Sequence, residues 1–199
     1  EGSLRPDTVL VSIMHVNNEI GVIQNLSAMS QRVRERGILF HVDAAQSAGK
    51  VSLDVSKVPV DLMSLSAHKV YGPKGVGALY VRRDARHRLT PQLHGGGHEQ
   101  GLRAGTVPPH QVVGMGEAFR LARLELDQDR SRLEVWRARL VAGLTAIPCV
   151  AMNGSQTQRV PGIVSVRFHG VMSESLMSAM VDVAVSAGSA CSSGSIQPS

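Results

Sequence analysis

The sequence is poor in aromatic residues and in cysteine, and it contains no long apolar run. Aromatic residues make up 3% of the 199 residues, so few side chains could stack on nucleic-acid bases. No apolar run approaches the roughly 18 residues of a membrane-spanning helix. The two cysteines, Cys149 and Cys191, make neither a disulfide framework nor a C-x-x-C metal motif. We therefore expect no nucleic-acid partner, no membrane span, no resident metal and a reducing, cytoplasmic setting.

The residues that are present suit a globular chain. Hydrophobic residues make up 43% and charged residues 19%, which is typical of one domain, or of one domain and part of another. The formal net charge is +5, and a basic surface favours an anionic cofactor or an acidic partner. The chain opens with Glu1-Gly2-Ser3, which is neither a signal peptide nor a methionine start. We expect a piece of a longer protein or a processed chain.

Apolar runs alternate with helical patterns in the first half. Strands are predicted at 8–13, 38–42, 60–65 and 75–81, and a helix between the first two is predicted from its apolar face and its stop. That face consists of Leu26, Met29 and Val33, and the stop is Gly37. Because the strand runs do not alternate strictly with polar residues, we expect a mostly parallel sheet with helices on both faces, the α/β class.

The second half begins with a loop-like stretch at 90–110 and a long helix from near Val112. An apolar helical face continues through Leu133, Trp136, Leu140 and Leu144. A strand is predicted at 163–168 and a helix at 173–183. We place a domain boundary near Leu126, inside the helical region. The expected domains are 1–126, a large cofactor-binding domain, and 127–199, a smaller C-terminal domain that contains Cys191; both are expected to be incomplete.

Two strand ends carry residues that suit pyridoxal phosphate (PLP) chemistry. Lys69 follows the run 60–65 within Ser66-Ala67-His68-Lys69, and Asp43 follows the run 38–42. Ligands of such sheets gather at the carboxyl ends of the strands. A lysine amine there can hold the cofactor aldehyde, an acid can keep the ring nitrogen protonated, and Ser66 and His68 could donate to a phosphate. Alone, Asp43 would be interpreted as a cap or turn residue and Lys69 as a surface lysine; together they favour PLP.

Two further segments leave more than one interpretation. The stretch His15 to Gly21 contains Asn17-Asn18, which favours either a turn or an asparagine at the cofactor rim. Cys191 alone would be interpreted as a buried structural cysteine, but its serine and glycine neighbours favour an exposed loop whose thiol can meet a substrate and then a partner. Cys149, in an apolar context after Pro148, is expected to be inert. No G-x-S-x-G or H-E-x-x-H motif is present, which excludes the corresponding hydrolases.

The chain resembles the cysteine desulfurases of the NifS-like and IscS-like group, within the class-V aminotransferase family. The matching stretches run in order through nearly the whole sequence. They are VSIMHVNNEIG (11–21), HVDAAQS (41–47), HKVYGPKG (68–75), GGGHE (95–99), RAGT (103–106) and GSAC (188–191). The resemblance implies a PLP-dependent transferase of fold type I, an α/β architecture with a smaller C-terminal domain, and a homodimer.

The resemblance also implies a role for each matching residue at the cofactor. Lys69 would be the Schiff-base lysine and Asp43 the partner of the ring nitrogen. Gln46 would bond the ring hydroxyl, and Ser66 and His68 would hold the phosphate.

The resemblance implies roles for three more residues. Asn18 would sit beside the ring, and Thr106 would reach the phosphate in the neighbouring subunit. Cys191 would attack the sulfur of L-cysteine, release alanine and carry a persulfide. That sulfur would pass to an iron–sulfur scaffold protein, to tRNA thiolation or to other acceptors. The one metal role left open is transient iron–sulfur ligation by Cys191.

The chain also departs from the family pattern. It lacks the N-terminal stretch that supplies early strands, a phosphate-binding loop and a stacking histidine, and it ends at Ser199, before the arginine for the substrate carboxylate. Two alternatives to an active desulfurase therefore stay open. One is a catalytically incompetent chain that survives as a binding or dimerising module, and the other is a selenocysteine lyase.

Overall fold

The structure is a computed structural model that describes residues 2–188. This part of the chain falls into two compact units. The first comprises the residues up to His15 together with Gln24–Leu126, and the second comprises Val16–Ile23 together with the residues from Asp127 onward. The short segment Val16–Ile23 therefore groups with the second unit, although it directly follows the first strand.

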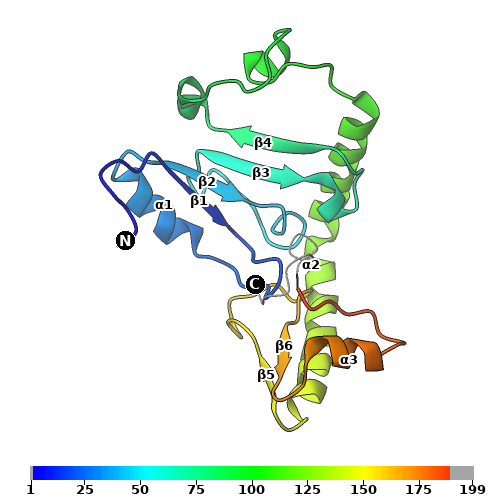
Figure 1. Cartoon of the computed structure of the whole chain (residues 1–199). Helices are drawn as coiled ribbons and strands as arrows, with labels where there is room; N and C mark the ends of the chain where they lie inside the picture. Colours follow the sequence, from blue (N-terminus) through cyan, green and yellow to red (C-terminus); the bar gives the residue numbers. More distant parts are fainter. Residues whose placement is uncertain (1, 189–199) are drawn as a thin grey trace. The chain divides into compact units, whose positions relative to one another are not determined.

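A four-stranded sheet forms the centre of the first unit (Figure 1). In spatial order its strands are β1 (Leu10–Met14), β2 (Leu39–Asp43), β3 (Leu62–Ser66) and β4 (Gly77–Val81). The first three strands are parallel, and β4 pairs antiparallel to β3. The four predicted strands are confirmed, with bounds shifted by one or two residues.

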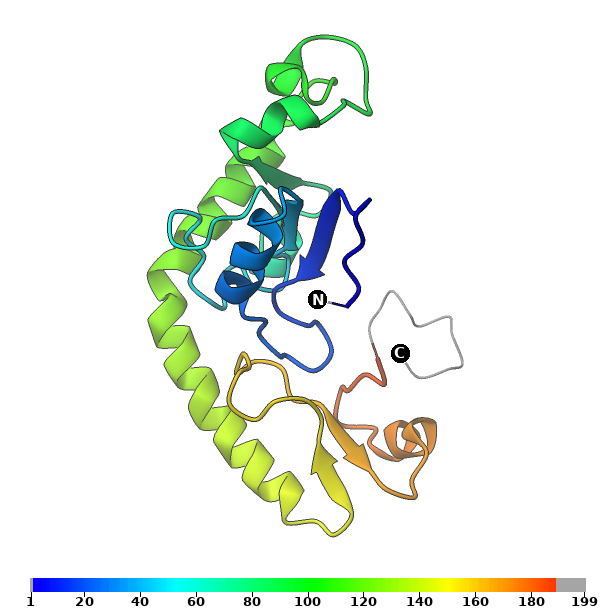
Figure 2. The same ribbon diagram turned by 90° about the vertical axis from the view of Figure 1, so that its left-hand side faces the viewer.

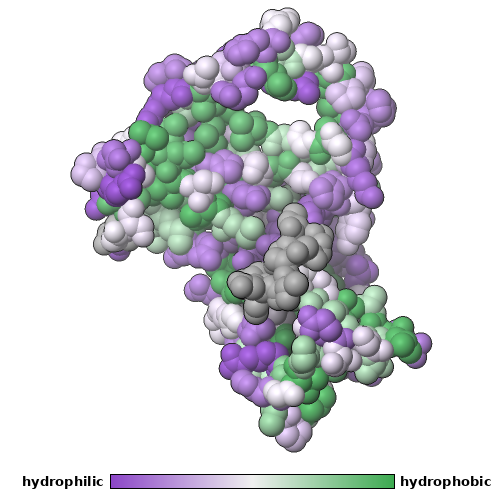
Figure 3. Space-filling model, in the orientation of Figure 1, coloured by the Kyte–Doolittle hydropathy of each residue, from purple (hydrophilic) through white to green (hydrophobic). Residues whose placement is uncertain are grey.

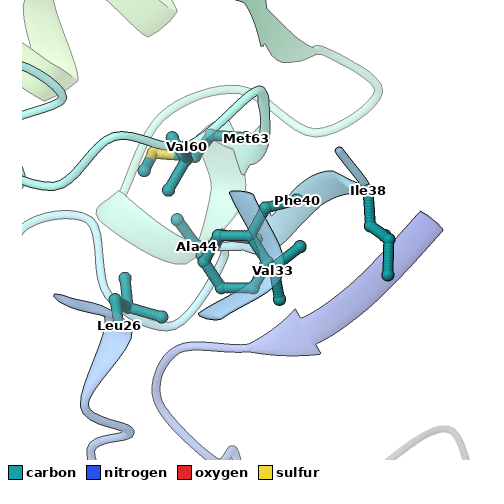
Figure 4. Close-up of a cluster of buried hydrophobic side chains, with 8 residues drawn as sticks. Leu26, Val33, Ile38, Phe40, Ala44, Val60 and Met63 are labelled. Carbon is teal, nitrogen blue, oxygen red and sulfur yellow. The ribbon is translucent and has the colours of Figure 1, made fainter. Parts of the chain in front are cut away.

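The core of the first unit is a cluster of buried apolar side chains from α1 (Leu26–Arg34), the strands and the segments beside them (Figure 4). Leu26 and Val33 of α1 contact a buried cluster that includes Phe40 and Val42 of β2, both fully buried. The side chain of Asn25 caps α1 by accepting a hydrogen bond from the Ala28 backbone N–H. The predicted helix, with this apolar face, is therefore confirmed.

One expectation about the sheet is wrong for the described residues. Val9, just before β1, and Leu79 of β4 leave 69% and 54% of their surface exposed, and Leu10 is exposed as well. Figure 3 shows apolar side chains gathered over the sheet on the face turned to the viewer. β1 and β4 are the sheet's two edges, so within residues 2–188 their apolar side chains lack the cover on both faces that the continuous apolar runs predicted.

A stripe of small residues lets α2 (Pro109–Thr145) approach the turn between β3 and β4. Gly114, Ala118 and Ala122 follow one another at every fourth position of the helix. A Cβ atom on Gly114 would lie 2.7 Å from Pro73, and one on Gly72 would lie 3.2 Å from Ala118. Both contacts join parts of the first unit. The glycines are therefore required by close packing and not by loop flexibility.

The second unit contains a short hairpin and one further helix (Figure 2). β5 (Val150–Met152) pairs antiparallel with β6 (Val166–Phe168), and α3 (Ser173–Ala179) follows. Sequence analysis missed β5 and predicted β6 and α3 too long. α3 ends early because Met180 leaves the helical conformation, with φ −98° and ψ 60°.

The apolar face that was predicted for the later part of α2 is largely exposed. Trp136 and Leu140 leave 58% and 50% of their surface exposed. The described part of the chain includes no helix that is both long and apolar enough to cross a membrane.

Candidate active site

The parallel pairing of β2 and β3 brings two candidate residues to one edge of the sheet. Asp43 is the last residue of β2 and pairs in register with Ser64 of β3. Ser66, the last residue of β3, is two positions further along the same direction. The carboxyl ends of neighbouring parallel strands therefore place Asp43 beside the turn that begins at Ser66, where α/β sheets bind their ligands.

Lys69 lies on a single tight turn at this edge. The 3₁₀ helix η1 (Ala67–Val70) follows β3 directly, and its Ala67 and Val70 are buried whereas His68 and Lys69 are exposed. Tyr71 ends the turn in the left-handed region with φ +64°, and the Gly72 N–H donates to the Ala67 carbonyl at 2.9 Å. The buried side chains of Ala67 and Val70 thus anchor the turn, while Lys69 is exposed.

Hydrogen bonds orient the polar side chains around this turn. Ser66 Oγ and His68 Nδ1 share a hydrogen bond of 2.9 Å, and Asp43 Oδ1 accepts from the Ala45 backbone N–H at 2.9 Å. A carboxylate, a hydroxyl, an imidazole and an amine therefore lie at the carboxyl ends of β2 and β3. This donor set fits PLP, which offers an anionic phosphate, a ring nitrogen and an aldehyde that reacts with an amine.

Lys50 belongs to this cluster, and sequence analysis missed it. Its Nζ donates to Gln46 Oε1 at 3.1 Å. Burial lowers the pKa of Lys50, and the positive charge of Lys69 lowers it further. The spacing of four residues between Gln46 and Lys50, directly after β2, could have revealed the pair if a helical turn had been expected there.

Behind Asp43, His41 occupies the middle of β2. Its Nδ1 shares a hydrogen bond of 2.7 Å with Ser12 Oγ of the neighbouring β1. Burial lowers the pKa of His41, and the nearby Asp43 carboxylate partly opposes that change.

The second unit contains the turn that sequence analysis left with two interpretations. Asn17 forms the turn itself, because its Oδ1 accepts from the N–H groups of Glu19 and Ile20, both at 2.9 Å. Asn18 is half-buried and lines a cavity of about 670 Å³, a size usual for small-molecule sites. The turn interpretation is therefore confirmed for Asn17, while a rim role for Asn18 stays a prediction.

The same cavity reaches the segment that leads to Cys191. Ala187 and Gly188, near the end of the described residues, line it together with Asn18. Cys191 itself lies outside the described residues. Thr106 is exposed in the segment before α2.

Cys149 differs from the apolar setting that its neighbours suggested. It is exposed and adopts a left-handed backbone with φ +67°. Among residues 2–188, no three histidine, cysteine, aspartate or glutamate side chains gather where they could hold a metal ion.

Comparison with known proteins shows which proteins this chain is similar to. A profile of the family described as "Aminotransferase class-V" matches residues 1–199. The cysteine desulfurase IscS of Tolumonas auensis is 61% identical over 199 residues, which cover 100% of this chain and 49% of that protein. The chain spans about half the length of the curated relatives it matches.

Solved structures are similar in fold as well as in sequence. The crystal structure of DndA from Streptomyces lividans is 41% identical, with a TM-score of 0.80, and the match covers 91% of this chain and 51% of that one. A structure of SspA in complex with cysteine is 35% identical, with a TM-score of 0.79, and the match covers 97% and 53% of the two chains. These similarities confirm the predicted α/β fold.

Proposed function

Because the chain belongs to the class-V aminotransferase family, we propose that its protein is a PLP-dependent cysteine desulfurase. The observation that supports this most is the placement of Lys69 on an anchored turn after β3, with Asp43 at the end of the adjacent parallel strand. The substrate is L-cysteine, and the similar SspA has been solved in complex with cysteine. The products are L-alanine and a persulfide on Cys191.

The residues of the first unit bind and orient the cofactor in this proposal. Lys69 would hold the cofactor aldehyde, Asp43 would keep the ring nitrogen protonated, and Ser66 with His68 would bind the phosphate. When bound, the cofactor supplies an electron sink for the substrate's Cα. The Lys69 amine would move the proton at the substrate's Cα.

The residues of the second unit receive the sulfur. The Cys191 thiolate attacks the substrate sulfur, so that an S–S bond forms as the substrate's C–S bond breaks. The electrons of the C–S bond remain with the carbon fragment, which takes up a proton and leaves as alanine. The shared cavity of Asn18 and the segment that leads to Cys191 supports this role. The persulfide then passes to an iron–sulfur scaffold protein, to tRNA thiolation or to other acceptors.

The remaining assignments belong to the same proposal. The cofactor domain corresponds to 1–126 and the smaller domain to 127–199, the protein acts as a homodimer in the cytoplasm, and Thr106 contacts the phosphate bound by the neighbouring subunit. The exposure of Thr106 is compatible with such a contact.

The test uses protein expressed from the complete reading frame. PLP addition should produce a visible absorption band, borohydride reduction should fix the cofactor on Lys69, and L-cysteine should yield alanine and sulfide. Lys69→Ala should abolish the band and the turnover. The matched control is Lys57→Ala, which alters an exposed lysine whose side chain is 81% accessible. A band that survives in Lys69→Ala would contradict the proposal.

A further inference from the structure

The turn after β2 brings Lys50 to the proposed cofactor edge by backbone geometry. The N–H groups of Ala48 and Val51 donate to the carbonyls of Ala44 and Ser47, respectively, which winds the chain into a helical turn. Gln46 and Lys50 are four residues apart in this turn and therefore lie on the same side of it. Both side chains are half-buried.

Contacts of Gly49 fix this turn against the one that carries Lys69. A Cβ atom on Gly49 would lie 3.1 Å from Val70 Cγ1 and 3.1 Å from Ala122 of α2. Val70 directly follows Lys69 in η1. The two turns are therefore packed together, which explains why the Lys69 charge lowers the pKa of Lys50.

While Lys50 is charged, it can only be the donor in its hydrogen bond with Gln46. An ammonium group has three donors and no acceptor, so the Gln46 atom at 3.1 Å must be its carbonyl oxygen. The usual ambiguity between the oxygen and nitrogen of an amide is thereby removed. The amide NH₂ of Gln46 then points away from Lys50 and can only donate.

We infer that Lys50 is a positioning residue that fixes the Gln46 amide so that its NH₂ faces the cofactor, which makes this part of the site specific for an oxygen acceptor. The inference rests on the proposed function, because it takes the ligand beside Gln46 to be PLP. The ring oxygen of PLP is such an acceptor. Lys50 itself contacts neither the substrate nor the reacting atoms in this role.

The first experiment measures PLP dissociation constants and the visible spectrum in the full-length protein. Lys50→Met should weaken PLP binding about tenfold, as expected for one hydrogen bond to a charged group, and shift the band. Lys50→Arg, which keeps a cationic donor, should restore both. Lys57→Met, at an exposed position, should change neither.

A double-mutant cycle separates positioning from a direct effect of charge. Gln46→Ala should weaken PLP binding as much as Lys50→Met, and the double variant should be no weaker than either. If Lys50→Met still weakens binding in the Gln46→Ala background, Lys50 acts through its charge on Lys69 and the inference is wrong.

Gln46→Glu gives a test that does not depend on how Lys50→Met folds. A carboxylate keeps the Lys50 partner but offers an acceptor where the amide offered a donor. Binding of PLP should therefore be weaker in Gln46→Glu than in Gln46→Ala, and equal or tighter binding would overturn the inference. If the parent protein shows no Lys69-dependent band at all, the proposed function fails and the inference with it. A parent band with unchanged Lys50→Met spectra and affinity would overturn the inference alone.

Discussion

The two units differ in what they bury. In the first unit the buried side chains are mainly apolar, and Phe40, Val42 and Val60 are almost wholly inaccessible. In the described part of the second unit, the buried residues include Val16, Val160 and the charged Arg159, which is 7% exposed. The first unit is therefore built around an apolar cluster, although it also buries the Asp61 carboxylate, whereas the few buried residues in the described part of the second unit include the charged Arg159.

Arg159 joins two segments of the second unit that are distant in sequence. Its Nη2 donates to the carbonyls of Ile20 at 3.1 Å and Ile163 at 2.7 Å. Gly21 adds a close contact, because a Cβ there would lie 3.0 Å from Ile163 Cβ. Arg159 thus fixes the turn that carries Asn18. The comparison shows that the turn of Lys69 is held by packed apolar side chains, whereas the segment of Asn18 is held largely by hydrogen bonds.

The largest expected effect separates the chemistry of the two units. Cys191→Ser should retain the cofactor band of the first unit but lower sulfide release from cysteine by at least about a thousandfold, because a hydroxyl is a far poorer nucleophile near neutral pH. Cys149→Ser should leave turnover largely intact. Spectra and sulfide assays on both variants check this, and an essential Cys149 with a dispensable Cys191 would reverse the assignment.

The next largest effect tests the contrast in packing. Phe40→Ala should reduce the free energy of unfolding by about 3–5 kcal/mol, since it leaves a cavity in a core that cannot collapse fully. Trp136→Ala, at a side chain that is 58% exposed and stacked on Arg132, should cost less than about 1 kcal/mol. Urea unfolding of the cofactor-free protein measures both. Equal losses would mean that α2 buries Trp136 against a surface outside the described residues.

A smaller effect is expected where the Arg159 side chain donates hydrogen bonds to the carbonyls of Ile20 and Ile163. Arg159→Met removes the donors to two part-buried carbonyls and should destabilise the second unit by about 2 kcal/mol. Hydrogen exchange should then accelerate at residues 17–22 and 158–163 but not in β2 or β3. Arg159→Lys should retain part of the protection, because its ammonium can still reach one carbonyl. If hydrogen exchange accelerated uniformly through both units, the hydrogen bonds of Arg159 would not stabilise the second unit alone.

The sequence predicted elements best where local pattern and packing agree. The strands at Leu39–Asp43 and Leu62–Ser66 are continuous apolar runs that lie inside the sheet, and their ends gave the candidates Asp43 and Lys69. β5 was missed because three residues with no alternation carry almost no periodic pattern, and its pairing with β6 is a long-range contact.

The sequence could not show which apolar faces stay exposed or which polar groups meet across turns. Val9 and Leu79 are apolar residues of the kind that strands bury, yet both are exposed. Their exposure depends on what covers the edge strands, which the sequence does not show. From sequence alone Lys50 resembles a surface lysine. The close contact between Gly49 and Val70, which brings its turn against the turn of Lys69, appears only in the structure. Arg159 likewise has no motif, since its partners are backbone carbonyls that no side-chain pattern marks.

The smallest expected effect is a pH dependence of stability in the first unit. His15 is 8% exposed, and within the described residues its buried Nδ1 has no hydrogen-bond partner. Burial lowers its pKa below the ordinary value of 6.5, and burial also lowers the pKa of His41. Just below pH 6.5 the unfolded chain therefore binds more protons than the folded chain, so stability falls as the pH falls.

This loss should begin near pH 6.5, the ordinary histidine value, and should level off below the lowered pKa values of the folded protein. Each unit of pKa difference corresponds to about 1.4 kcal/mol. His15→Gln should flatten the decline between pH 7.5 and 5.5 in urea unfolding, because glutamine does not titrate in this range, and His41 should account for part of the remainder. His87→Gln, at an exposed position, should leave the slope of the parent protein. An unchanged slope in His15→Gln would contradict this prediction and would mean that water reaches Nδ1.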